Sequence, residues 1–269
     1  MAVGLFIRFI VVGQHLKHDS LINYSFILNG KDDTQFLTSG TGSIIHFKTK
    51  YYLVTNFHVF SGKDALTNQK FPDQKDTNTA ISVIFQPKDR KSKFVPIVYP
   101  IYSPNGTELF KKFIFQNTII DIAVMPIVLP FNIAKFSFEL TDLDTSFSYT
   151  DARKLMMFGF PYGKFKNIWQ PTELDGNAVT NSQSGPFIYD PFVFIDTAPI
   201  PGMSGSPIYE YDSENKIKVL SVASNMTDFM PSMPRMKGRS IYIKYAMQLI
   251  REMYLAKAPS VKGEVYQAK

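Results

Sequence analysis

A serine flanked by two glycines is the first feature of this sequence that could do chemistry. Residues 202–207 read Gly-Met-Ser-Gly-Ser-Pro, with Ser204 near the centre. Glycines allow a tight turn with positive φ, which can expose a hydroxyl and aim neighbouring backbone N–H groups at one point. Such a turn suits a nucleophile beside an oxyanion site, although Gly-Ser turns also serve as plain β-turns. The segment is not the Gly-x-Ser-x-Gly elbow of α/β-hydrolases, because position 206 is serine.

A nucleophilic serine needs a base and an acid that orients the base. Of the four histidines, His58 is the best placed, because it follows the apolar run 51–57 and precedes a polar loop. Asp121 is a lone carboxylate within the apolar run 118–126. Burying that charge is costly unless it is paired, and a histidine N–H would pair it. The alternatives are a core histidine and an aspartate on the exposed face of an edge strand.

The three candidates occur in the order His58, Asp121, Ser204. This is the chymotrypsin-type order, whereas subtilisin and the α/β-hydrolases use others. Histidine and aspartate fall in the first half of the chain and serine in the second. A site at the cleft between two β-rich halves would be built in this way.

Composition limits the alternatives. The chain has 269 residues, 45% of them hydrophobic and 19% charged, which is typical of a globular protein. It has no cysteine, which excludes disulfides, thiol nucleophiles and iron–sulfur clusters. No long apolar run predicts a membrane-spanning helix, and no histidine and carboxylate spacing predicts a metal site or cofactor. The net charge of +6 is spread along the chain, so a nucleic-acid-binding barrel is only a weaker alternative.

The elements that must position these residues are mostly strands. Short β-branched and aromatic runs separated by Gly, Pro, Asn and Asp predict a barrel or sandwich. The predicted strands are 21–28, 42–47, 51–55, 80–86, 94–99, 155–160, 192–197, 207–211 and 216–223. Residues 61–79 and 161–191 are predicted loops, and apolar spacing from Ala246 to Tyr254 predicts one helix. Residues 1–13 are expected to be a first strand or a removed signal.

With these motifs the sequence resembles the chymotrypsin-fold serine peptidases, particularly their trypsin-like and HtrA-like branch. Five segments in chain order carry the resemblance: residues 38–45 (TSGTGSII), 52–59 (YLVTNFHV), 121–124 (DIAV), 158–163 (FGFPYG) and 196–207 (DTAPIPGMSGSP). The resemblance implies an all-β fold of two antiparallel six-stranded β-barrels with a C-terminal helix. It implies a first barrel over residues 1–140, a second over 141–256 with the helix, and a disordered tail over 257–269.

The resemblance also implies roles for the candidate residues. Ser204 would be the nucleophile, His58 the general base and then acid, and Asp121 the residue that fixes the histidine tautomer. The backbone N–H groups of Gly202 and Ser204 would form the oxyanion hole. The chain would then be a serine endopeptidase that needs no cofactor.

The specificity pocket would include Ala198, Ser224 and Asn225, which suggests an uncharged, small or medium apolar residue before the cleaved bond. The expected partners are a protein or peptide substrate and an activating protein, with no nucleic acid. A latent or inactive peptidase-like module that binds peptides is the alternative. The compartment stays open, with the cytoplasm slightly favoured. No extension for a PDZ domain is evident, so a peptidase domain alone is expected.

Overall fold

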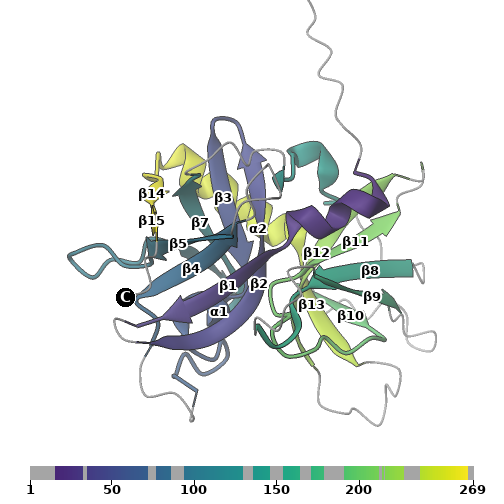
Figure 1. The fold of residues 1–269 in the computed structure, drawn as a ribbon, viewed down its shortest axis with the longest axis horizontal. Coiled ribbons are helices and arrows are strands. Elements are labelled where there is room, and N and C mark those ends of the chain that lie inside the picture. The colour runs from purple at the N-terminus through teal and green to yellow at the C-terminus, as the bar shows by residue number, and fades with distance from the viewer. Residues whose placement is uncertain are drawn as a thin grey trace, which may run out of the picture.

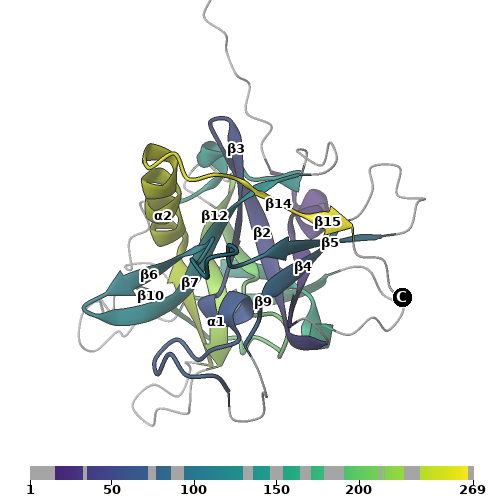
Figure 2. The same cartoon turned by 90° about the vertical axis from the view of Figure 1, so that its left-hand side faces the viewer.

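The computed structural model describes residues 16–32, 35–71, 77–85, 94–129, 136–145, 154–163, 171–178, 191–211, 214, 216–226 and 237–265. These residues form two β-sheets that stand side by side, with one longer helix packed between and behind them (Figures 1 and 2). Residues 1–13, predicted to be a strand or a signal, lie outside the described residues. Within the described residues, no helix is long and apolar enough to cross a membrane.

Residues 26–128 supply most of one sheet, to which two short C-terminal strands are added, and residues 154–242 supply the other. The strands of the first are β1 (Phe26–Lys31), β2 (Phe36–Phe47), β3 (Lys50–Thr55), β4 (Ala80–Phe85), β5 (Val95–Pro100), β6 (Lys111–Phe115), β7 (Thr118–Val128), β14 (Val261–Lys262) and β15 (Glu264–Val265). Those of the second are β8 (Lys154–Gly159), β9 (Thr172–Asn177), β10 (Phe192–Ile195), β11 (Pro207–Tyr211), β12 (Ile217–Met226) and β13 (Gly238–Tyr242). The helices are η1 (His18–Tyr24), α1 (Phe57–Ser61), η3 (Leu140–Asp142), η4 (Pro161–Gly163) and α2 (Ile243–Leu255). The predicted all-β fold with a C-terminal helix is confirmed.

The second sheet has the predicted six strands, in the order β10-β13-β12-β11-β8-β9. A further antiparallel bridge between Ala178, just after β9, and Ile195 at the end of β10 joins its two edges. The backbone N–H of Asp196 extends this junction by donating to the Asn177 carbonyl at 3.1 Å. The six strands therefore curl into a barrel with no free edge at this point.

The first sheet runs β7-β3-β2-β1-β4-β5 and is extended by β6, β14 and β15. The two edge strands of this run are both paired to the C-terminal segment, because β14 pairs with β7 and β15 pairs with β5. The hydroxyl of Tyr99 on β5 also donates to the Val128 carbonyl on β7, at 3.1 Å. The sheet is thus a six-stranded run whose edges are linked by residues 261–265.

Several segments differ from the prediction, and β6 and β13 lie in stretches for which no strand was predicted. The chain beyond residue 256 was expected to be disordered, but it forms β14 and β15, because the edges of the first sheet offer unpaired backbone groups. Residues 172–177, in a predicted loop, form β9, an edge strand held by backbone pairing to β8 although its side chains are mostly exposed. The first part of the predicted strand 21–28 belongs to the 3-10 helix η1, and β1 begins at Phe26.

The 3-10 turn of η1 has a packing reason. Side chains three residues apart lie on one side of such a helix, which turns Leu21 and Tyr24 towards the protein. Leu21 is fully buried, and the ring of Tyr24 stacks on Phe138 with centroids 4.8 Å apart. Ser25 then donates to the Phe158 carbonyl of β8 at 2.9 Å. The N-terminal segment therefore ties the start of β1 to the second barrel.

The apolar core continues from one barrel to the other. One cluster of buried side chains fills the first barrel, and a larger one joins the second barrel, part of the first and α2. Helix α2 is predicted correctly and buries seven side chains: Ile243, Tyr245, Ala246, Met247, Leu249, Ile250 and Met253. Each fully buried large side chain stabilises the fold by about 1.5–3 kcal/mol. This shared core holds the two barrels in one arrangement, which a site between them requires.

Candidate active site

His58 lies in α1, a single turn of helix that follows β3. Strand β3 is buried over its last four residues, and it pairs with β7 so that Thr55 lies opposite Ala123. The helix ends at Gly62, whose φ of 68° is left-handed and whose N–H donates to the His58 carbonyl at 2.9 Å. The turn therefore projects the imidazole next to the part of β7 that carries Asp121.

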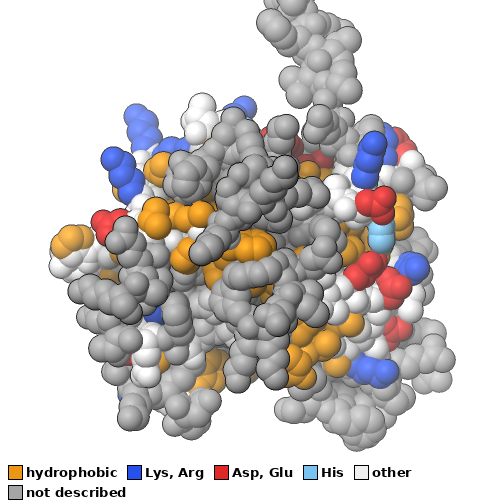
Figure 3. Space-filling view, viewed as in Figure 1, with side chains coloured by type: hydrophobic (Ala, Val, Ile, Leu, Met, Phe, Trp, Pro, Cys, Tyr) orange, Lys and Arg blue, Asp and Glu red, His pale blue; other side chains and the backbone are white. Residues whose placement is uncertain are grey.

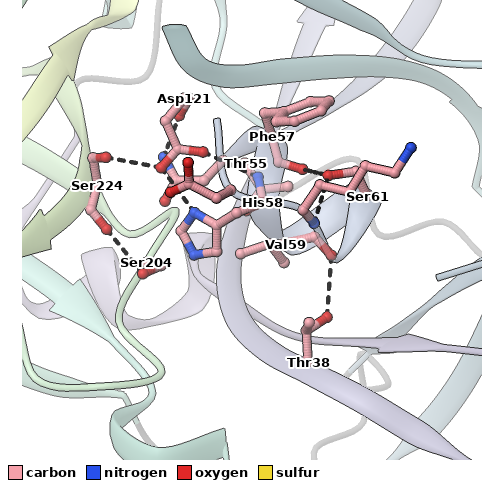
Figure 4. Close-up of polar contacts among 12 residues, drawn as sticks. Thr38, Thr55, Phe57, His58, Val59, Ser61, Asp121, Ser204 and Ser224 are labelled. Carbon is pink, nitrogen blue, oxygen red and sulfur yellow. Dashed lines mark hydrogen bonds and ion pairs between the residues drawn. The ribbon is translucent and has the colours of Figure 1, made fainter. Parts of the chain in front are cut away.

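Asp121 and His58 are joined by two hydrogen bonds (Figure 4). The Nδ1 atom of His58 is 2.8 Å from Oδ2 of Asp121, and the backbone N–H of His58 donates to Oδ1 at 3.0 Å. The Asp121 side chain is 8% exposed and that of His58 is 19% exposed. The carboxylate is thus a paired, buried charge rather than a residue on the exposed face of an edge strand, which was the alternative from the sequence.

The two groups shift one another's pKa. Burial alone lowers the pKa of His58, but the charge and hydrogen bond of Asp121 outweigh it and raise the pKa of the imidazole above its usual value. Burial alone raises the pKa of Asp121, but the charge and hydrogen bonds of His58, together with a bond from Ser224, lower it below its usual value. The pair thus favours an ionised aspartate that bonds to the Nδ1–H of the histidine.

Ser224 on β12 completes the surroundings of Asp121. Its hydroxyl donates to Oδ2 of Asp121 at 2.8 Å, and its carbonyl accepts the hydroxyl of Ser204 at 2.9 Å (Figure 4). The Ser204 hydroxyl therefore points to the Ser224 carbonyl rather than to His58. Rotation about the χ1 torsion of Ser204 is the change that would redirect this hydroxyl, because the backbone of the loop is held by other bonds.

Ser204 lies in the loop between β10 and β11, in which the five carbonyls of residues 200–204 all accept hydrogen bonds. The Ile200 carbonyl accepts the N–H of Met203 at 2.9 Å, and the Met203 carbonyl accepts the N–H of Ser206 at 3.0 Å. Residues 200–206 therefore form two successive β-turns. The carbonyl of Pro201 accepts the N–H of Tyr162 at 2.5 Å. Among the described residues, neither Gly202 nor Ser204 donates its backbone N–H to another group. Two N–H groups are thus available next to the serine.

Thr41 on β2 clamps this loop from the first barrel. Its backbone N–H donates to the Ser204 carbonyl at 2.7 Å, and its hydroxyl donates to the Gly202 carbonyl at 3.0 Å. The same hydroxyl accepts the backbone N–H of Phe160 at 3.0 Å. A Cβ on Gly205 would lie 1.9 Å from the Thr41 carbonyl, so only glycine allows this approach. Thr41 is fully buried and joins both barrels at the site.

The predicted specificity residues are only partly placed. Ala198 is half-buried just after β10, and Asn225 lies on β12, although its side chain is outside the described residues. Gly238 of β13 pairs with Met226 and packs against Thr197 and Pro199. Residues 197, 199 and 226 therefore all neighbour Gly238. The hydroxyl of Ser224, assigned to that pocket from the sequence, is bonded to Asp121.

The other polar groups that the structure describes form no second site of this kind. Within the described ranges, no group of three or more His, Asp or Glu side chains could hold a metal ion. On the face shown in Figure 3, the described Lys and Arg side chains lie in several separate places, and apolar side chains gather nearer the middle. The rings of Phe71 and His58 are nearly perpendicular, with centroids 6.2 Å apart.

Sequence reasoning did not single out Ser224 as a partner of Asp121, Thr41 as a clamp, or Asn56. The side-chain amide of Asn56 donates to the Asp121 carbonyl at 2.6 Å. One physical signal was available. A carboxylate kept ionised in the interior needs more donors than one histidine supplies, so a hydroxyl beside Asp121 was to be expected. Its identity depends on which strand of the second barrel reaches β7.

Two packed β-barrels, with a buried Asp–His pair on one and a serine turn on the other, define the class of chymotrypsin-like serine proteases. The model of the trypsin-like peptidase domain matches residues 40–217. The chain belongs to this family of trypsin-like peptidase domains. No curated protein sequence matches the chain significantly.

Solved structures agree on the fold. A serine endoprotease from Yersinia pestis is similar over 90% of this chain and 68% of its own, with 15% identity and a TM-score of 0.52. A thermostable serine protease, AL20, from an extremophilic microorganism is similar over 88% of this chain and 99% of its own, with 11% identity and a TM-score of 0.53. At these identities the likeness shows the fold alone.

Proposed function

We propose that the chain is a serine endopeptidase in which Ser204 is the nucleophile, His58 the general base and Asp121 the residue that orients the base. The observation that carries the proposal is the buried pairing of His58 Nδ1 with Asp121, at 2.8 Å. This bond keeps the proton on Nδ1 and leaves Nε2 as the acceptor that a serine hydroxyl requires. A histidine and an aspartate that served only to stabilise the fold would have no reason to keep Nε2 of His58 available as an acceptor.

The proposed reaction starts with the Ser204 hydroxyl turned towards His58. Nε2 takes the proton as Oγ attacks the carbonyl carbon of the substrate peptide, and the oxyanion is bound by the N–H groups of Gly202 and Ser204. His58 then gives the proton to the nitrogen of the scissile bond, the C–N bond breaks, and the amine leaves with the acyl group still bound to Oγ of Ser204 as an acyl-enzyme. Water, activated by the same imidazole, releases the acid. Every step uses side chains and backbone groups of this chain, and the substrate class is a protein or peptide.

One observation favours a second function, that of a latent peptidase module. The Ser204 hydroxyl donates to the Ser224 carbonyl at 2.9 Å instead of to His58. A site held in this rotamer would bind peptide without cleaving it until a partner changed the rotamer. The other polar contacts favour the active form, because the Asp121–His58 pair is complete.

Labelling with a fluorophosphonate probe separates the two functions. The wild type is compared with Ser204→Ala and His58→Ala. Ser20→Ala is the control, because among the described residues its hydroxyl bonds only to the Lys17 carbonyl. Labelling of the wild type and the control, lost in the other two variants, is the expected result. Folded wild-type protein that takes up no label overturns the endopeptidase proposal in favour of the latent module. New N-termini in digested casein then identify the cleaved bonds.

A further inference from the structure

The proposed oxyanion donor Gly202 belongs to a β-turn of a recognisable type. The N–H of Met203 donates to the Ile200 carbonyl at 2.9 Å, which makes Pro201 and Gly202 the two central residues. The φ of Gly202 is 93°, and a proline ring holds φ near −65°. Proline followed by a residue with positive φ is the pattern of a type II turn.

A type II turn has a close alternative. Types I and II keep the same closing hydrogen bond and differ mainly in the direction of the central peptide, which here is Pro201–Gly202. Proline suits the second position of both types, and glycine accepts φ of either sign at the third. The N–H of Gly202 is part of this peptide. The local sequence therefore allows the donor to point in either of two opposite directions.

A contact from outside the turn selects the direction. The N–H of Tyr162 donates to the Pro201 carbonyl at 2.5 Å. In a trans peptide the C=O and N–H groups point in opposite directions. Holding the Pro201 carbonyl towards Tyr162 therefore holds the Gly202 N–H away from it. The hydroxyl of Thr41 fixes the next peptide through the Gly202 carbonyl, so both planes that flank Gly202 are held.

Tyr162 adopts a costly conformation to make this contact. Its φ of 61° and ψ of 2° lie in the left-handed region, which is unusual for an aromatic residue. Its side chain gains little in return, because Tyr162 is 63% exposed. Backbone strain of this kind persists only where the surrounding structure determines it, and it is concentrated at functional sites. The group that benefits from the strain is the backbone N–H, which points at the Pro201 carbonyl.

We propose that Tyr162 is a positioning residue: its left-handed backbone holds the 200–203 turn in the type II form and thereby aims the Gly202 N–H as an oxyanion donor. The proposal rests on the proposed function, because the donor matters only if an oxyanion forms. It assigns the role to the backbone of Tyr162 and not to its ring.

Substitutions at this position separate backbone from ring. Tyr162→Gly and Tyr162→Asn remove the ring but accept positive φ, whereas Tyr162→Val disfavours it strongly. With a fluorogenic peptide amide that has alanine before the cleaved bond, we expect kcat of the Gly and Asn variants to stay within about threefold of wild type. We expect Tyr162→Val to lose at least about tenfold in kcat with KM nearly unchanged. Complete loss of one oxyanion donor, on the order of 10²–10³-fold, is the ceiling.

A peptide boronic acid, whose tetrahedral adduct mimics the intermediate, supplies the second readout. Its Ki is expected to rise in Tyr162→Val by the same factor as kcat/KM falls, and to stay close to wild type in Tyr162→Gly. Equal losses in the Val, Gly and Asn variants would show that the ring acts and would overturn the proposal. Unchanged kcat in Tyr162→Val would also overturn it.

Crystal structures test the proposal independently of activity. The Pro201 carbonyl is expected to keep its direction in wild type and Tyr162→Gly and to rotate away in Tyr162→Val. An unrotated carbonyl in a folded Tyr162→Val variant refutes the proposed selection of turn type. Wild-type protein that neither reacts with fluorophosphonate nor cleaves peptide refutes the proposed function instead, so the two failures are distinct.

Discussion

The Asp121→Asn substitution tests the reasoning about the site because it keeps the shape of the side chain and changes one acceptor into a donor. The carboxylate accepts three hydrogen bonds from two residues. Oδ1 accepts the backbone N–H of His58 at 3.0 Å, and Oδ2 accepts the Nδ1–H of His58 and the hydroxyl of Ser224, each at 2.8 Å. An asparagine has one oxygen and one NH2 group for these two places.

The side-chain amide of the Asp121→Asn variant can be placed in two ways, and only one of them avoids bringing two N–H donors face to face. If the nitrogen replaces Oδ1, it meets the backbone N–H of His58, and each buried donor left unpaired costs about 1–3 kcal/mol. If it replaces Oδ2, the Ser224 hydroxyl can rotate to accept one hydrogen, and the imidazole can accept the other at an unprotonated Nδ1. The second placement is favoured. It moves the histidine proton to Nε2, which then cannot accept the proton of Ser204.

The expected consequence is a loss of about 10⁴-fold in turnover, the size associated with the wrong tautomer at a Ser-His-Asp site. Peptide hydrolysis and the rate constant of fluorophosphonate labelling measure it, and circular dichroism checks the fold. Asp64→Asn is the matched control: Asp64 acts on His58 through its charge alone, and an amide oxygen can still accept the N–H groups of Leu66 and Thr67. Activity of Asp121→Asn within tenfold of wild type, or an equal loss in Asp64→Asn, would refute the reasoning.

Three further predictions follow from the same contacts. Because the pKa of His58 is raised, kcat/KM should fall as pH drops through a value above 6.5, whereas the stability from the charged pair, measured by urea unfolding, should be lost as pH rises through it. Ser224→Ala should raise the pKa of Asp121 and cost about 1.5–3 kcal/mol in urea unfolding at pH 7, since a bond to a buried carboxylate is lost; an unchanged unfolding midpoint would contradict this. Gly205→Ala should abolish labelling, because its Cβ would overlap the Thr41 carbonyl, whereas Gly106→Ala, with a similar positive φ and open space, should keep it.

Much of the fold could be predicted because the relevant signals are local. Alternating and continuous apolar runs predicted most strands, and the apolar period from Ala246 to Tyr254 predicted α2. Segments that depend on a distant partner were missed. Strand β9 is polar and mostly exposed, so it carries no apolar pattern. Strands β14 and β15 have only two residues each, which is too short for a pattern. All three exist because β8, β7 and β5 offer backbone groups to pair with.

The sequence by itself determined which side chains were candidates for chemistry. A histidine after a buried strand, an aspartate inside another and a serine between glycines are visible from residue type and order, and the structure brings Asp121 and His58 together. The turn glycines also follow from the sequence, since Gly202 and Gly205 both have positive φ.

Only the tertiary structure decided the orientation of the polar groups. Ser224 bonds to Asp121, Thr41 to the Gly202 carbonyl and Tyr162 to the Pro201 carbonyl. Each of these bonds joins different strands or turns, and the first two cross from one barrel to the other. The physical reason is that a hydroxyl rotor or a turn peptide has several orientations of nearly equal local energy. A directional bond from a distant residue, held in place by the packed core, selects one of them.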